Sequence, residues 1–299
     1  MRRTLILLSI IIFTCMAFST HALAKTEEGD LLTSREILSS TRGYGLANAM
    51  TAASSGTTAI WHNPAGITAA QMYSFDASYF YQHDASGHGF ETNIVDMKSN
   101  QYVGAGLGFL YQYATPNKDD TQHTIHLRFG AGVPLANNLI SLGISGLYSH
   151  IKYNGKQRLS QFSMDAGLVI RPLDWLSLGL SAQNLIVGDY KNYMPRMISA
   201  GIAVGSIELG LNAMFDVSFN LSADKIPKSG SYGIGVEYVL KEFVPLRLGY
   251  RYEGDEHHVL SAGIGYRHDG GIFGLDLAYQ HHFEDYSNEL LSAALEFYF

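Results

Sequence analysis

The chain has 299 residues, a formal net charge of −7 and one cysteine, with 31 glycines, 19 tyrosines and 15 phenylalanines but only 16% charged residues. The acidic balance and the lack of a basic run argue against nucleic acid as a partner. A single cysteine excludes a disulfide framework and a cysteine-type zinc site. Many aromatic residues among few charges are typical of membrane β-barrels, whose strands face lipid on one side.

The first 24 residues have the layout of a secretory signal peptide. Two arginines precede an apolar run over residues 5–18, and Ala-Leu-Ala at 22–24 supplies an A-x-A cleavage site. The run is shorter than the ~20 apolar residues of a spanning helix, and Ile-Phe-Thr before Cys15 lacks the small residues of a lipoprotein signal. Cleavage at this site removes Cys15 and two of the 20 basic residues but none of the 27 acidic ones, which leaves a formal charge of −9.

Residues 25–70 are rich in Gly, Ala, Ser and Thr and have no period-two run. Short helical pieces are expected around 31–40 and 46–53. A flexible periplasmic tail is one interpretation of this segment. A tryptophan at Trp61 and a tight Asn-Pro-Ala-Gly turn at 63–66 instead indicate a packed structure. We therefore predict a plug, or hatch, inside a barrel.

From residue 71 onward the dominant pattern has period two, and the last segment shows it best. Every second residue from Leu291 to Phe299 is apolar, and the residues between them include Ser292 and Glu296. Successive side chains of a strand point to opposite faces, so one face is apolar and the other mostly polar or small. The same alternation upstream predicts fourteen strands, at residues 71–82, 88–97, 101–113, 122–133, 138–151, 160–171, 175–187, 196–204, 206–220, 230–240, 244–253, 257–268, 271–283 and 290–299.

Strands of this kind also suit a soluble sandwich or a lipocalin-like barrel. Two features favour a membrane barrel instead. Tyr and Phe lie near the ends of many apolar faces, as in the aromatic girdles at lipid–water boundaries. The final strand carries Phe297 and Phe299, an ending that resembles the terminal signal recognised by the outer-membrane barrel assembly machinery. We predict an all-β, transmembrane antiparallel β-barrel over residues 71–299, in a Gram-negative outer membrane, with a hatch over 25–70.

The predicted connections alternate in length. Short ones lie near residues 100, 134–137, 172–174, 205, 241–243 and 269–270. Mostly longer, polar ones lie near 114–121, 152–159, 188–195, 221–229 and 284–289. Outer-membrane barrels have short periplasmic turns and longer external loops. With Phe299 at the periplasmic rim, the longer set faces the outside.

The polar faces of the predicted strands would line the lumen with charges of both signs. Glu237 and Arg247 lie across the turn at 241–243, so we expect them to pair directly. One interpretation is a set of ion pairs that satisfies buried charges; the other is a polar lumen that holds the hatch or lines a path. The predicted lumen-facing polar residues are Asp165, Arg171, Glu208, Asp216, Glu237, Arg247, Arg251, Glu253, Arg267, Asp276 and Glu296.

Two histidine pairs, His257-His258 and His281-His282, invite a metal hypothesis. Adjacent strand residues point to opposite faces, so each pair offers one imidazole to a shared site. Solvated loop residues or contacts with lipopolysaccharide fit these pairs better than a weak cation site. Hydrolysis lacks support because the sequence has no G-x-S-x-G elbow, and Ser261 faces the predicted lumen while the nearby histidines lie at the strand end. We expect no enzyme activity, no metal and no cofactor.

The Arg-Gly-Tyr-Gly stretch at 42–45 is not a phosphate cradle, because it follows no strand and lacks the lysine of a P-loop. Its glycines instead let the backbone pack closely against a barrel wall or adopt positive φ. The Asn-Pro pair at 63–64 indicates a turn. The residues to which we assign a hatch role are Arg42, Gly43, Gly45, Trp61, Asn63, Pro64 and Gly66.

Two stretches, TRGYGLANA at 41–49 and AIWHNPAGI at 59–67, resemble the N-terminal signature of the long-chain fatty acid transporter (FadL-like) superfamily, especially its PorV-like branch. Members often read A-R-G-x-G-x-G-x-A and then A-x-x-x-N-P-A-G-L. Further matches follow in order, among them MDAG at 164–167, QNL at 183–185 and LRLGYR at 246–251. The resemblance thus spans most of the chain beyond the signal peptide.

The resemblance implies a fourteen-stranded barrel whose N-terminal segment enters the lumen as a hatch. Its fatty-acid branch is associated with uptake of hydrophobic molecules, and its PorV-like branch with protein export and surface attachment. Ala47-Asn48 departs from the glycine-rich motif, so the hatch backbone is expected to differ there. The chain is also shorter than typical fatty acid transporters, which puts their external ligand-capturing loops in doubt.

Two functions follow from these observations. The first is a hatch-plugged transporter or channel for small hydrophobic molecules. The alternative is a non-transporting, PorV-like barrel that docks secreted or other partner proteins in secretion or envelope organisation. In either case the expected partners are outer-membrane lipid, lipopolysaccharide and, during biogenesis, the barrel assembly machinery.

Overall fold

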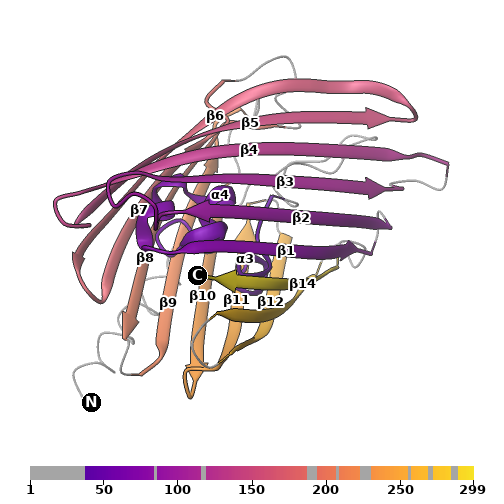
Figure 1. Ribbon diagram of the computed structural model, residues 1–299. Coiled ribbons are helices and arrows are strands. Elements are labelled where there is room, and N and C mark those ends of the chain that lie inside the picture. Colours follow the sequence, from indigo (N-terminus) through magenta and orange to yellow (C-terminus); the bar gives the residue numbers. More distant parts are fainter. Residues whose placement is uncertain are drawn as a thin grey trace.

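The computed structural model is a closed barrel of antiparallel strands (Figure 1). It describes residues 38–83, 86–115, 119–186, 194–206, 209–222, 230–254, 257–268, 272–283 and 289–299. Its strands are β1 (Tyr73–Gln82), β2 (Gly87–Asp96), β3 (Gly104–Ala114), β4 (Gln122–Leu135), β5 (Ile140–Tyr153), β6 (Lys156–Leu173), β7 (Leu176–Gln183), β8 (Met197–Ser206), β9 (Leu211–Asn220), β10 (Gly230–Leu240), β11 (Val244–Glu253), β12 (His257–Arg267), β13 (Phe273–His282) and β14 (Leu290–Tyr298). Each pairs with its neighbours in sequence, and β1 pairs with β14 to close the wall. The predicted antiparallel barrel of fourteen strands is confirmed.

The period-two pattern places apolar side chains on the outside of the barrel and small or polar ones inside. On β14, Leu291 is 56% exposed while Ser292, the next residue, is 5% exposed. On β12, Leu260 is 47% exposed and Ser261 is fully buried. Such an inverted distribution suits a wall whose outer surface contacts lipid, because lipid replaces the missing apolar core.

The two rims of the barrel differ in their connections. Tyr73 and Phe299 exchange backbone hydrogen bonds at one rim, which we call the turn rim. The opposite rim, which we call the loop rim, carries the two longest connections, at 184–196 and 221–229. This asymmetry agrees with the expected arrangement of short turns on the side of Phe299.

Three predicted connections are wrong. The short one expected near residue 100 spans residues 97–103, because β2 ends at Asp96 and β3 begins at Gly104. The long loop expected at 152–159 is a two-residue turn, because Asn154 and Gly155 have φ values of 50° and 72° and join β5 directly to β6. Asn-Gly is the preferred sequence for such a hairpin turn. Gly205, where a turn was expected, lies within β8, and the connection to β9 follows Ser206. Leu209, expected in a strand, is therefore part of that connection. Glu208 lies outside the described residues.

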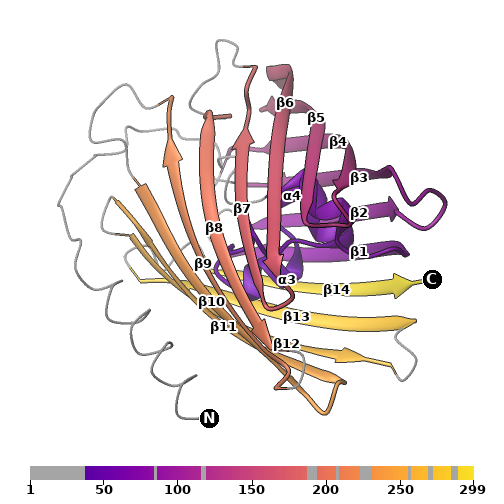
Figure 2. The same cartoon turned by 90° about the vertical axis from the view of Figure 1, so that its left-hand side faces the viewer.

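Residues 38–70, which we call the lumen segment, lie within the barrel; both views show α3 and α4 enclosed by the strands (Figures 1 and 2). Its elements are α3 (Thr41–Gly45), η1 (Gly56–Thr58), α4 (Ala59–His62) and η2 (Pro64–Ala69). The helix expected at 46–53 is absent, since Ala47 and Asn48 have positive φ and turn the chain. Of the helical piece expected at 31–40, residues 31–37 lie outside the described residues and 38–40 are not helical.

Candidate functional site

The lumen segment is the most deeply buried part of the described chain. Tyr44 and Trp61 are each 1% exposed, and Ile60 and Ile67 are fully buried. Burying one such aliphatic side chain stabilises a structure by about 1.5–3 kcal/mol relative to leaving it in water. These residues therefore hold the segment against the inner wall.

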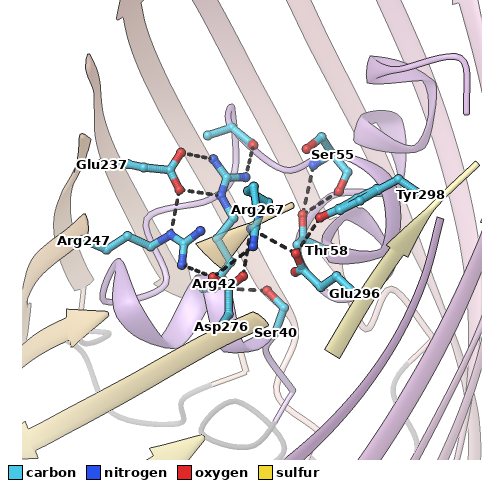
Figure 3. Close-up of polar contacts among 12 residues, drawn as sticks. Ser40, Arg42, Ser55, Thr58, Glu237, Arg247, Arg267, Asp276, Glu296 and Tyr298 are labelled. Carbon is cyan, nitrogen blue, oxygen red and sulfur yellow. Dashed lines mark hydrogen bonds and ion pairs between the residues drawn. The ribbon is translucent and has the colours of Figure 1, made fainter. Parts of the chain in front are cut away.

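An ionic cluster joins α3 to the wall near the turn rim (Figure 3). Arg42 Nη2 and Nε donate to the two oxygens of Glu237 at 2.8 Å and 3.0 Å, and its Nη1 donates to the carbonyl of Ala53 at 3.2 Å. Arg247 Nε shares the Glu237 carboxylate at 2.7 Å, so the predicted Glu237–Arg247 pair is present. Glu237 thus accepts charge-assisted hydrogen bonds from two guanidinium groups, one of them from the lumen segment.

The cluster continues along the wall through β12, β13 and β14. Arg247 Nη1 reaches Asp276 at 2.7 Å, and Arg267 Nη2 bridges Asp276 and Glu296 at 2.9 Å each. With Arg42 included, the cluster contains three arginines and three carboxylates, so its formal charges cancel. Removing one partner of such a buried set leaves an uncompensated charge, which typically costs 3–5 kcal/mol.

Asn63 links the tight turn of the lumen segment to two strands. Its Nδ2 donates to the carbonyls of Thr51 at 2.7 Å, Leu180 at 3.2 Å and Leu168 at 3.3 Å. Its Oδ1 accepts the Ala65 N–H at 3.1 Å and so caps η2. One side chain therefore satisfies backbone groups of the segment and of β6 and β7, which requires an amide at this position.

Trp61 and its neighbours attach α4, the part of the lumen segment away from the ionic cluster, to the barrel wall. Trp61 Nε1 donates to Asn93 Oδ1 at 2.9 Å, and Asn93 Nδ2 contacts both Asp76 and Glu91. Arg128 lies over the indole ring with its guanidinium carbon 5.3 Å from the ring centre. The same arginine donates to the Ile60 carbonyl at 3.0 Å and pairs with Asp165 at 2.6 Å. Stacking and ion pairing together hold the α4 side of the segment against β2 and β4.

Glycines in the barrel wall allow the backbone of the strands to approach the backbone of the lumen segment closely. A Cβ added to Gly179 would come closer than 3.0 Å to the carbonyl group of Thr51, and one added to Gly143 would do the same at Pro64 and Ala65. Because the obstructing atoms are backbone, a side chain at either glycine could not be accommodated by rotation of a neighbour. The inner wall thus has a shape that fits the lumen segment.

Burial sets the ionisation of the lumen segment. Burial opposes the charge of Arg42, but the Glu237 carboxylate outweighs it, so the pKa of Arg42 lies above its ordinary value. For His62, burial together with the positive charges of Arg128 and Arg42 lowers the pKa to about 3. The imidazole is therefore neutral at physiological pH, and its Nε2 lies 3.2 Å from Ser39 Oγ.

The remaining predicted lumen-facing residues lie on the inner wall at several places. Asp216 accepts the Thr51 N–H at 2.7 Å, and Arg251 Nη1 donates to the Ala47 carbonyl at 3.3 Å. Arg251 also pairs with Glu253 at 2.8 Å. Arg171 donates to Ser141 rather than to the lumen segment. The structure thus brings most of the predicted set to the segment, directly or through a shared partner.

Several lumen residues of β1 to β6 were not predicted from the sequence. Asp76, Glu91, Asn93 and Arg128 all point inward, and the period-two parity of their strands was the signal that could have identified them. Apolar side chains also point inward, contrary to the expected polar lumen. Those that form one buried cluster with Tyr44 and Trp61 are Phe80, Val95, Leu110, Leu147, Ile151, Leu159, Ala278 and Leu290.

Part of this apolar cluster lies toward the loop rim. Phe80 lies near the loop-rim end of β1, and its ring centre is 6.1 Å from that of Tyr44. Leu290 begins β14 at the same level. Buried polar side chains lie at the same level, among them Gln82, Gln112 and Gln122, so this half of the lumen is mixed in polarity, while the ionic cluster lies toward the turn rim.

Three cavities border the lumen segment. One of ≈ 90 Å³ lies against Trp61, His62, Asp216 and Arg251. Another of ≈ 190 Å³ lies beside Ala53 and Arg171, and a third of ≈ 360 Å³ lies beside Arg42 and the ionic cluster. Each has charged side chains in its lining, so none is an apolar chamber.

The described residues hold no group of three or more His, Cys, Asp or Glu side chains placed to bind a metal ion. No described helix has the length and apolar character needed to cross a membrane. At the C-terminus, the Phe297 ring packs against Phe75 and Phe273, with centres 6.1 Å and 5.5 Å apart, and Phe299 is exposed at the turn rim. The assembly role of these two terminal residues stays a prediction.

No protein-family model and no curated protein matches the sequence. Solved structures do match over most of the chain. The CymD monoaromatic hydrocarbon channel superimposes with a TM-score of 0.67 at 13% identity, covering 89% of this chain and 98% of that one. A Pseudomonas aeruginosa FadL homologue gives 0.62 at 12% identity over 87% and 98%, and the Ralstonia pickettii toluene transporter TbuX gives 0.61 at 12% over 85% and 97%. This chain therefore has the barrel fold that these channel and transporter proteins share.

Proposed function

We propose that this protein is an outer-membrane barrel that passes small hydrophobic molecules, and that its N-terminal segment, predicted over residues 25–70, is the hatch that closes it. The observation that carries the proposal is the inward-facing apolar cluster around Phe80, Leu110 and Leu147. A general porin lines its lumen with polar groups and water. Sites for hydrophobic ligands are instead lined by apolar and aromatic side chains.

The comparisons support the same function at the level of fold. The match covers 98% of the hydrocarbon channel and 97% of the toluene transporter, so both are built on the same barrel fold. The orientation follows from the connections, with the loop rim outside. The proposal includes export by a signal peptide over residues 1–24 and insertion by the barrel assembly machinery through Phe297 and Phe299.

Passage requires the hatch to move, because packed side chains close the lumen. Thr41 Oγ1 and Ser292 Oγ are 2.7 Å apart and join α3 to β14, so Thr41→Cys with Ser292→Cys places two sulfurs within disulfide reach. Ser199 and Ser218 lie equally close on β8 and β9, at 2.8 Å. Ser199→Cys with Ser218→Cys therefore links two wall strands and leaves the hatch free. Cys15→Ser removes the only native cysteine from both variants.

The test is uptake of a labelled monoaromatic hydrocarbon into proteoliposomes. We expect oxidation of the Thr41–Ser292 variant to abolish uptake and reduction to restore it, while the Ser199–Ser218 control stays active in both states. Full uptake through a quantitatively cross-linked hatch would contradict the proposal. No uptake by any reduced protein would favour the alternative, a PorV-like barrel that docks partner proteins.

A further inference from the structure

One row of side chains crosses the outer face of five strands near the loop rim. Tyr81 on β1 lies opposite His88 on β2, and His88 lies opposite Tyr113 on β3. Tyr113 in turn lies opposite His123 on β4, and His123 opposite Lys152 on β5. We call these five residues the rim row. It consists of two tyrosines, two histidines and one lysine and contains no acid.

Two further tyrosines, each two residues nearer the turn rim than the tyrosines of the rim row, orient the two histidines. Tyr79 Oη lies 2.6 Å from His88 Nδ1, and Tyr111 Oη lies 2.9 Å from His123 Nδ1. The rings of the rim row pack beside them, with centres 5.1 Å apart for both Tyr81–His88 and Tyr113–His123. When the phenol donates to Nδ1, the proton of a neutral imidazole lies on Nε2. Each histidine then presents an N–H away from its tyrosine whether or not it is charged.

The same arrangement occurs again across the barrel. Tyr250 Oη lies 2.5 Å from His258 Nδ1, and the Tyr252 and His258 ring centres are 5.1 Å apart. Tyr250 and Tyr252 are two residues apart, as are Tyr79 and Tyr81. The recurrence on β11 and β12 shows that the arrangement belongs to the loop rim rather than to one hairpin.

The level of the rim row coincides with the expected outer boundary of the membrane. Below it, Phe90 and Ile125 continue the outward face with apolar side chains. β5 and β6 have 14 and 18 residues, more than the ~9–11 that a tilted strand needs to span a bilayer. Their hairpin therefore projects beyond the lipid, and Lys152, the next-to-last residue of β5, lies in the projecting part.

We propose that the rim row binds the phosphate groups of the glycolipid headgroups in the outer leaflet. The two imidazole N–H groups and the Lys152 ammonium suit a phosphate, and the tyrosine rings suit the adjoining boundary. Among the ion pairs of the described residues, none involves Lys152, although the whole chain is acidic at −7. The inference rests on the outer-membrane location and orientation proposed above and is independent of transport.

The test compares retained lipid in three proteins reconstituted in phosphatidylcholine vesicles that contain either bisphosphorylated lipid A or its dephosphorylated form. The variant replaces His88, His123 and Lys152 by Gln. A control with Lys98→Gln and Lys241→Gln removes basic side chains beyond the turn-rim ends of β2 and β10. After detergent extraction and purification, mass spectrometry counts lipid A per protein, and heat-shifted gel mobility confirms folding.

Wild type and control should retain phosphorylated lipid A at least about fivefold above the dephosphorylated form, since each basic side chain near an anionic surface contributes about a fivefold preference. The triple variant should lose this preference. Equal retention of both lipids by wild type, or an unchanged preference in a folded triple variant, would overturn the proposal. If the triple variant does not fold, Lys152→Gln alone should still lower the preference severalfold, and no change there would also overturn it.

Discussion

Glu237 shows how single residues stabilise charge inside this barrel. Its carboxylate accepts hydrogen bonds from Arg42 of the lumen segment and Arg247 of the neighbouring strand, and its side chain is 7% exposed. The Glu253–Arg251 pair lies on the same wall, but its carboxylate is 26% exposed. The two acids therefore differ in burial more than in chemistry, which makes them a matched pair.

We predict that Glu237→Gln lowers the free energy of unfolding by about 3–5 kcal/mol, because two buried guanidinium groups lose their common counter-charge. The control, Glu253→Gln, should cost less, because its carboxylate is 26% exposed and only one guanidinium group, that of Arg251, loses its counter-charge. Urea unfolding in lipid vesicles measures both. Equal losses in the two variants would show that the cluster does not hold Arg42 as described.

His62 predicts a pH dependence. The folded chain keeps this imidazole neutral because its pKa is lowered to about 3, whereas an unfolded histidine takes up a proton near pH 6.5. Below pH 6.5 the unfolded state therefore binds more protons than the folded state, and the free energy of unfolding decreases as the pH is lowered. Wild type should lose about 1.4 kcal/mol per pH unit relative to His62→Gln between pH ~6 and ~4. Parallel stability curves for the two proteins over that range would disprove the assignment.

At the scale of elements, the lumen segment depends on shape as well as on charge. Its helices are too short to be stable alone, since isolated helices below about 12 residues are marginal in water. They persist because wall glycines let backbone meet backbone. Gly179 and Gly233 both face the segment, but an added Cβ would overlap the Thr51 backbone at Gly179 and make ordinary contact, at 3.5 Å or more, at Gly233.

We predict that Gly179→Ala displaces the segment and Gly233→Ala does not. Displacement should reduce disulfide formation between cysteines at Thr41 and Ser292 severalfold and increase proteolysis of residues 38–70. The barrel itself should remain folded in both variants, as heat-shifted mobility would report. Normal cross-linking in folded Gly179→Ala would contradict the close approach on which this prediction rests.

The elements differ in how well the sequence predicts them. Strands such as β10 and β11 were placed at their observed bounds, because alternation and lipid exposure act on every residue of the wall. The β5–β6 turn was missed although Asn154-Gly155 carries a strong local signal. The helix expected at 46–53 is absent because Ala47 and Asn48 have positive φ, a conformation in which asparagine is enriched.

For the whole molecule, pairing between neighbouring strands was predictable and docking of the lumen segment was not. Glu237 and Arg247 face each other across one turn, so their contact follows from register. Arg42 lies 195 positions from Glu237, and no periodicity relates them. The inward-facing Phe80 and Leu110 were assigned to no face, although the period-two parity of β1 and β3 places each of them on the face of small and polar residues. The closed lumen is thus a property of the assembled barrel.

The measurement that tests the central claim most directly is selective uptake into proteoliposomes. It compares a labelled monoaromatic hydrocarbon with a labelled sugar, in the intact protein and in a variant lacking residues 25–70, with folding checked by heat-shifted mobility. We predict that the intact barrel passes the hydrocarbon and excludes the sugar, and that the variant passes both. An intact, folded barrel that passes neither solute, or passes both equally, would contradict a hatch-controlled path for hydrophobic molecules.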